Sequence, residues 1–109
     1  MITHKEVEEY ILSMPNARLD YPFGEGVAVY KTADDKMFAL IAEKTNPVKL
    51  SLKCDPLLAK TLRERYESVM PGYHLNKKHW NTIILSGQLE WNEVQDLIRH
   101  SYLLVTGQE

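Results

Sequence analysis

The sequence has a single cysteine and lacks long apolar runs. These two features argue against a disulfide-stabilised protein and against a membrane-spanning one. The 109 residues include one cysteine, Cys54, so no disulfide can form within the chain and a reducing compartment is expected. No apolar run approaches the roughly 20 residues that span a bilayer, and the N-terminus lacks the apolar core of a signal peptide. We therefore expect a cytoplasmic monomer that does not contact a membrane.

An excess of basic residues is also missing. The chain has 13 Lys and Arg against 15 Asp and Glu, which gives a net charge of −2. Nucleic-acid-binding proteins usually carry a basic excess, because neutralising phosphates supplies most of their affinity. This composition leans against such a role and leaves only a local basic patch to support it.

Glycine and proline are sparse and scattered, with five of each. No linker, internal repeat or low-complexity segment separates one part of the chain from another. At this length, with 44% hydrophobic residues, one core can form without a metal or a disulfide. The sequence therefore predicts a single domain over residues 1–109.

Apolar periodicity and turn residues predict the order of the elements. Helices are expected at about 3–14, 55–66 and 90–106, and strands at about 17–22, 27–32, 37–43, 48–53 and 79–86. Thr3 and Glu6 form a capping box at the first helix, Asp55 and Pro56 start the second, and Gly107 stops the third. Neighbouring strands with helices gathered on one face describe an α+β two-layer sandwich with an antiparallel sheet.

The strand at 48–53 alternates strictly between apolar and polar residues, so one of its faces is expected to be buried and the other wet. Lys49, Ser51 and Lys53 share the polar face. The open face of the sheet is accordingly predicted to carry the polar halves of its strands. If Lys77 and Lys78 join that face, a basic patch forms. Exposed strands also carry Lys and Ser for solubility alone.

The densest group of polar and aromatic side chains lies at residues 70–82, where Pro71 and Gly72 precede two histidines, two lysines and two asparagines. The rings of Tyr73 and Trp80 together with nearby lysines are the groups that hold single-stranded nucleic acid or a nucleotide. The alternative is a solvated loop between two strands, with Trp80 buried in the core. The sequence leaves both interpretations open.

Other chemistry has little support in the sequence. The four histidines show no metal-ligand spacing, so neither a metal nor any other cofactor is predicted. Cys54 precedes a helix start, where a thiolate is favoured, but a small buried hydrophobe is the alternative interpretation. His74 or His79 could act as a general base, yet no nucleophile or carboxylate pair accompanies them. We therefore expect a non-enzymatic protein.

Four segments carry a resemblance to a known family: YPFG at 21–24, VKLSLKCDP at 48–56, PGYHLNKKHWNT at 71–82 and HSY at 100–102. They resemble the MmcQ/YjbR-like family of small bacterial proteins over essentially the whole chain. The resemblance implies a frataxin/CyaY-like α+β fold and a DNA-binding role through a double-wing arrangement. Similarity to frataxin would also suggest iron binding, but this is an analogy at the level of the fold alone. The chain also lacks an acidic ridge suited to iron.

The leading hypothesis is a protein that binds DNA through the open sheet face and the loop at 70–82. The predicted phosphate contacts are Lys49, Lys53, Lys77 and Lys78. The residues predicted to orient or stack on bases are Tyr73, His74, Asn76, His79 and Asn81. The alternative is a module that binds a small anion or metabolite with the same residues.

Overall fold

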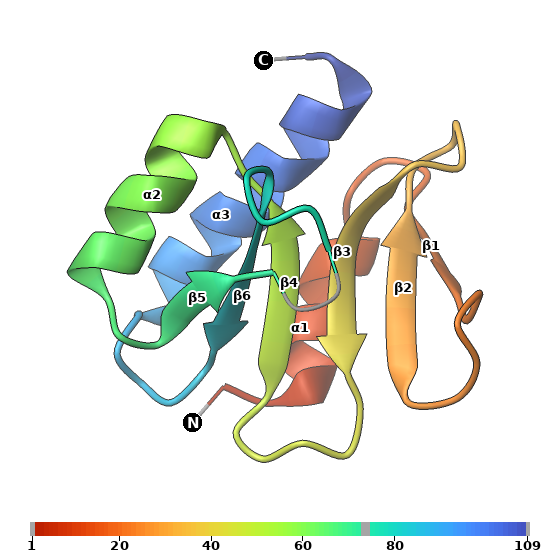
Figure 1. The fold of residues 1–109 in the computed structure, drawn as a ribbon. Helices are drawn as coiled ribbons and strands as arrows, with labels where there is room; N and C mark the ends of the chain where they lie inside the picture. Colours follow the sequence, from red (N-terminus) through yellow and green to blue (C-terminus); the bar gives the residue numbers. More distant parts are fainter. Residues whose placement is uncertain (1, 73–74, 109) are drawn as a thin grey trace.

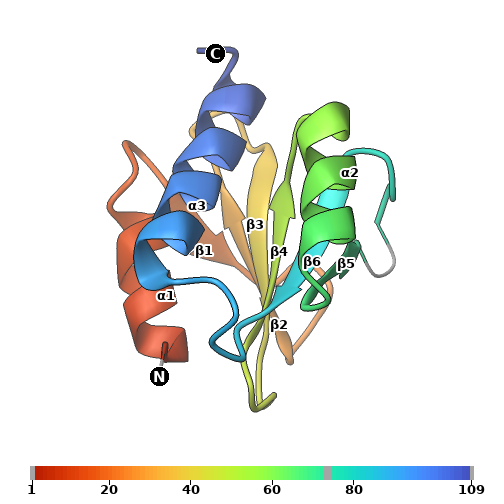
Figure 2. The same ribbon diagram turned by 90° about the vertical axis from the view of Figure 1, so that its left-hand side faces the viewer.

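A six-stranded antiparallel sheet carries three helices on one of its faces (Figures 1 and 2). This computed structural model describes residues 2–72 and 75–108. The elements in chain order are α1 (His4–Leu12), β1 (Arg18–Asp20), β2 (Val27–Lys31), β3 (Met37–Ala42), β4 (Lys49–Lys53), α2 (Pro56–Arg65), β5 (Val69–Pro71), β6 (Trp80–Ile84) and α3 (Trp91–Thr106). The sheet order is β1-β2-β3-β4-β6-β5. The predicted α+β class is confirmed, while the closer likeness to CyaY stays a prediction.

The starts of the helices and the end of α3 lie where the sequence places them, for the predicted reasons, while α1 ends at Leu12, two residues earlier than predicted. The side chain of Thr3 accepts a hydrogen bond from the backbone N–H of Glu6 at the start of α1. A carboxylate oxygen of Asp55 accepts from the N–H groups of Leu57 and Leu58 at the start of α2. Gly107 ends α3 in the left-handed conformation, with φ of 74°.

The main core lies between the sheet and the helices. Residues of all three helices pack into it, and the strands contribute their inward-facing residues; its largest members include Val7, Ile11, Tyr30, Phe38, Ile41, Leu50, Ile83, Val94 and Ile98. α2 covers the β6–β5 end of the sheet, while α3 lies over β3 and β4. Within the described residues, none of the helices has the length and apolar character needed to cross a bilayer.

The short strand β5 is not predicted by the sequence. Met70 of β5 pairs with Thr82 of β6, and Pro71 pairs with Asn81. A three-residue strand that ends in proline shows no alternation, and proline is tolerated there because β5 is an edge strand. Part of the stretch predicted as a loop is therefore the outer strand of a hairpin.

The prediction of a polar open face is wrong at the centre of the sheet. Val29 is fully buried there, and Leu40 and Trp80 are 7% and 8% exposed. Leu75, from the connection between β5 and β6, packs against these residues. Residues 75–79 lie across the open face (Figure 1), so the second apolar cluster lies between the sheet and this segment.

Candidate nucleic-acid interface

Two of the predicted lysines lie on the open face of β4, as the alternation requires. Lys49 is paired across the ladder with Ile84, and Lys53 is paired with Trp80. Four residues of extended chain separate the two lysines by roughly 13 Å. They share a face of the sheet but lie at opposite ends of the strand, so one phosphate cannot engage both.

The turn before β6 is shaped by Asn76. Its backbone carbonyl accepts hydrogen bonds from the N–H groups of His79 and Trp80, at 3.1 and 2.9 Å. Its side-chain oxygen accepts from the N–H of Lys78 at 2.9 Å. Asn76 therefore organises the turn, and Lys77 and Lys78 are both exposed on it.

A groove of about 510 Å³ lies between this turn and α2. Lys60 and Arg63 of α2 line it together with Lys78 from the turn, and Glu64 is the acidic residue at its edge. The sequence analysis missed the two α2 cations. Their spacing of three residues, which places both on one side of a helix, is the signal that could have found them.

Asn81 does not belong to this surface. It lies on the helix-facing side of β6, is 2% exposed, and donates a hydrogen bond from its side-chain nitrogen to the carbonyl of Ala59 at 3.2 Å. Asn81 thus connects β6 to α2 and cannot reach a ligand on the open face. Tyr73 and His74, two further predicted site residues, lie outside the described residues.

The carbonyl of His79 accepts a hydrogen bond from the N–H of Cys54 at 2.7 Å, which ties the turn to the chain just before α2. The side chain of His79 is half-buried. Cys54 is 3% exposed, which fits a small buried hydrophobe. Across residues 2–72 and 75–108, no three His, Cys, Asp or Glu side chains gather in a way that could hold a metal ion.

The cations of the opposite sheet edge are engaged with carboxylates. Lys31 lies 3.0 Å from a carboxylate oxygen of Asp20 and 3.5 Å from one of Asp35. The hydrogen bond from Lys31 holds the pKa of Asp20 below its ordinary value, and the N–H of Tyr21 acts in the same direction. In contrast, none of the ion pairs between described residues involves Lys53, Lys60 or Lys78.

The charges are distributed unevenly along the chain. Residues 49–82, which form β4, α2, β5, the turn and the start of β6, contain seven Lys and Arg against three Asp and Glu. The rest of the chain contains six against twelve. The chain therefore contains a basic segment although its net charge is negative. That segment includes α2 and the connection between β5 and β6.

Comparison with known proteins matches most of the chain to one family. A sequence model of the YjbR family matches residues 12–104. The uncharacterised protein YjbR of Escherichia coli (strain K12) is 34% identical over 93% of this chain and 85% of its own length. The uncharacterised protein YyaQ of Bacillus subtilis (strain 168) is 28% identical over 95% of this chain and 98% of its own.

Solved structures agree with the fold. The crystal structure of a Deinococcus radiodurans protein superposes with a TM-score of 0.92 at 37% identity, over 97% of this chain and 80% of that one. The crystal structure of a Pseudomonas syringae protein gives a TM-score of 0.81 at 30% identity, over 95% and 99%.

Proposed function

The chain belongs to the YjbR family, and we propose that it binds nucleic acid, in the first instance DNA, through the basic surface formed by α2 and the turn at 76–79. YjbR and YyaQ are both described as uncharacterised, so the support for the proposal comes from the surface. The observation that carries the proposal is the groove in which Lys60, Arg63 and Lys78 converge from two elements beside a single carboxylate.

This surface has the chemistry that a phosphate backbone requires. Lys60, Arg63 and Lys78 have no ion-pair partner among the described residues, so binding a phosphate breaks no salt bridge. Lys77 extends the same surface along the exposed turn. Contacts of this kind fix the position of a strand without reading its sequence, so we expect weak sequence preference.

The test is fluorescence anisotropy of labelled single- and double-stranded DNA from low to physiological salt. Changing Lys77 and Lys78 together to Glu is expected to abolish binding, and changing Lys60 and Arg63 to Gln is expected to weaken it. Neutralising Lys60 and Arg63 should reduce the slope of log affinity against log salt by about 2, because each phosphate contact contributes about 0.9.

A variant with Lys5 and Lys44 changed to Glu is the matched control. Both residues are exposed and outside the basic surface, and the variant makes the same change in net charge as the Lys77/Lys78 variant. It should bind nearly as well as the unmodified protein. The proposal fails if no binding occurs at low salt, if binding is insensitive to salt, or if the control loses affinity equally.

A small anion is the second candidate for the same surface. The groove beside α2, at about 510 Å³, falls within the size range of small-molecule sites. Thermal stabilisation by one anionic compound, with none from oligonucleotides, would select this candidate over DNA.

A further inference from the structure

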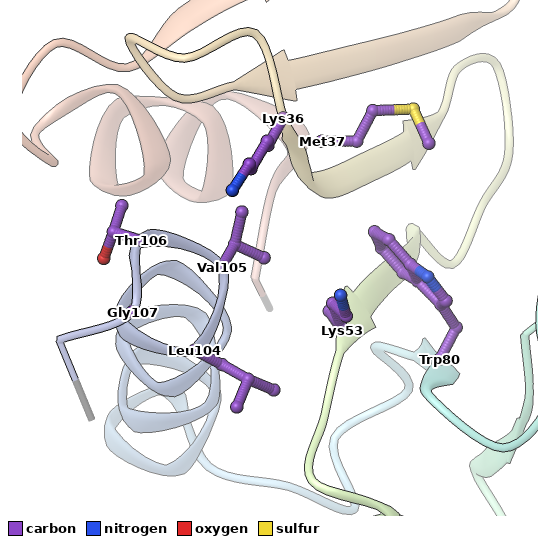
Figure 3. Close-up of a pocket in the computed structure, with 8 residues that line it drawn as sticks. All are labelled: Lys36, Met37, Lys53, Trp80, Leu104, Val105, Thr106 and Gly107. Atoms are coloured by element: carbon purple, nitrogen blue, oxygen red, sulfur yellow. The ribbon is translucent and has the colours of Figure 1, made fainter.

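A second groove, separate from the basic surface, lies at the C-terminal end of α3. Lys36 borders it from the turn before β3, Met37 from the start of β3, Lys53 from the end of β4 and Trp80 from the start of β6. Residues 104–107 form the remaining side. Figure 3 shows these side chains around the open space. The volume of about 610 Å³ is within the range of small-molecule sites.

The groove is lined by two cations and, among the described residues, by no carboxylate. Neither Lys36 nor Lys53 takes part in an ion pair between described residues. Asp35, the neighbour of Lys36 in the chain, instead forms ion pairs with Arg18 and Lys31. The amines of Lys36 and Lys53 therefore carry charge into the groove without a protein counter-ion, which favours an anionic ligand.

The remaining lining is mostly apolar. Trp80 borders the space beside Lys53, and Val105 lies across the space from it (Figure 3). Each of the two residues is 8% exposed, so each offers part of its side chain to the groove and not a whole face. The last carbonyls of α3 are capped, because Gly107 and Gln108 donate their N–H groups to Leu104 and Leu103 at 3.4 and 2.9 Å. This capping reduces the repulsion that a helix C-terminus exerts on an anion.

The buried hydroxyl group of Ser101 connects three of the elements that border the groove, namely α3, β3 and β4. Ser101 of α3 is fully buried, donates to the carbonyl of Phe38 at 2.6 Å, and accepts from the N–H of Lys53 at 3.0 Å. It therefore connects α3 to the start of β3 and to the end of β4, the two places from which the lysines project. A groove with fixed walls loses little conformational entropy when a ligand enters.

From these observations we propose that the groove binds a planar aromatic group that carries a phosphate, of the kind found in a nucleoside monophosphate. The phosphate lies between the amines of Lys36 and Lys53, and the ring contacts the exposed part of Trp80 beside Lys53. This inference goes beyond the proposed function, since it concerns another groove and a small ligand. The same chemistry is presented by a free nucleotide and by the phosphorylated end of a strand.

The test uses tryptophan fluorescence, because the chain has two tryptophans. Changing Trp91 to Phe leaves Trp80 as the reporter and keeps an aromatic ring beside Tyr10. Titration with AMP should quench Trp80 saturably. Adenosine alone and inorganic phosphate alone should each bind about tenfold more weakly or less, because each lacks half of the recognised chemistry.

Variants then locate the site. With Lys36 and Lys53 both changed to Gln in the Trp91→Phe background, AMP affinity should fall about tenfold or more, while Lys53→Arg should retain most of it. The control with Lys5 and Lys44 changed to Glu should bind AMP normally. Absence of saturable quenching by AMP overturns the proposal, as does quenching that persists unchanged in the Lys36/Lys53 variant. Far-UV circular dichroism confirms that each variant is folded.

An oligonucleotide arm separates the two sources of the ligand. Tighter binding of a 5′-phosphorylated oligonucleotide than of AMP, lost on removal of its phosphate, assigns the groove to a strand end. Equal or weaker binding assigns it to a free nucleotide. The Lys77/Lys78 variant distinguishes this inference from the proposed function, because it should lose DNA binding and retain AMP binding.

Discussion

Tyr30 shows how one side chain joins the sheet to α1. Its ring is buried in the main core, and its hydroxyl donates a hydrogen bond to a carboxylate oxygen of Glu8 on α1. Burial disfavours the phenolate, and the neighbouring carboxylate of Glu8 disfavours it further, so the pKa of Tyr30 is raised well above its ordinary value of 10.0. The folded protein holds this proton at a pH where the unfolded chain releases it.

This difference predicts a loss of stability at alkaline pH. Because the folded pKa is raised, the contribution of Tyr30 is fully present below about pH 10 and declines as the pH rises further. Tyr30→Phe should lower the free energy of unfolding at pH 8 by about 1.5–3 kcal/mol, the usual value for a hydrogen bond to a charged group. Its stability should then fall less steeply above pH 10, as measured by urea unfolding.

Glu8→Gln is the companion variant for Tyr30, because it removes the negative charge and leaves the ring buried. Its alkaline slope should lie between those of the unmodified protein and Tyr30→Phe. Identical slopes for all three proteins would show that Tyr30 does not control the alkaline transition. Tyr21, Tyr66 and Lys31, whose pKa values are also raised, contribute to the dependence that remains in Tyr30→Phe.

The sequence indicates which residues have the chemistry to bind a ligand more readily than it indicates the direction in which each side chain points. Lys49 and Lys53 lie on the open face, because strict alternation fixes their side relative to the buried Leu50 and Leu52. Asn81 was grouped with surface residues on its chemistry alone, and it lies under α2. Its side depends on the register between β4 and β6, which is set by contacts distant in the sequence.

At the scale of elements, the long helices and regular strands were predictable and the β5–β6 hairpin was not. Capping residues and apolar stripes mark α1, α2 and α3 locally. β5 is three residues long and exists because β6 offers it a partner edge. The local sequence therefore indicated a loop, while the fold makes residues 69–71 a strand.

Gly72 allows this hairpin to close. Its N–H donates to the carbonyl of Trp80 at 2.8 Å, and a Cβ atom added at Gly72 would lie 2.7 Å from the Cβ of Trp80. Contacts below 3.0 Å require something to move, and here the obstructing atom is next to the backbone of a central strand. A side chain at this position must therefore push β5 away from β6.

Gly72→Ala is expected to destabilise the protein by about 1–3 kcal/mol, the range typical of overpacking. The emission of Trp80 should also shift, because the displaced strand exposes its ring. Ser86→Ala, at an exposed position after β6, serves as the reference and should change stability by no more than about 0.5 kcal/mol. A Gly72→Ala protein as stable as this reference would contradict the close approach seen in the structure.

At the scale of the molecule, the sheet is a shared layer between two apolar clusters. Adjacent residues of β2 point into different clusters: Val29 into the one under the β5–β6 connection and Tyr30 into the one under the helices. Sequence alternation predicts the helix-side core well. It could not predict the second cluster, because the cover for Val29 and Leu40 comes from Leu75, which lies 35 or more residues further along the chain.

This sharing predicts that the two layers unfold together. Trp80 belongs to the open-face cluster, while Trp91 packs against the helix-side core and meets Tyr10 edge to face, with 5.9 Å between ring centroids. Neither cluster can lose the sheet without the other losing it too. A chain of this size whose two clusters share one sheet should therefore show one cooperative transition.

Two variants, Trp80→Phe and Trp91→Phe, each leave one tryptophan to report on one layer. In urea, the fluorescence midpoint of each variant should coincide with its own far-UV circular dichroism midpoint, because loss of the sheet removes both clusters at once. Comparing probes within one variant cancels any stability change caused by the substitution itself. If Trp80 instead responds at lower urea than the circular dichroism, the β5–β6 connection opens before the sheet unfolds. The open-face cluster would then be a separate, weaker unit, and Lys53 and Trp80 would not be held in place by the global fold.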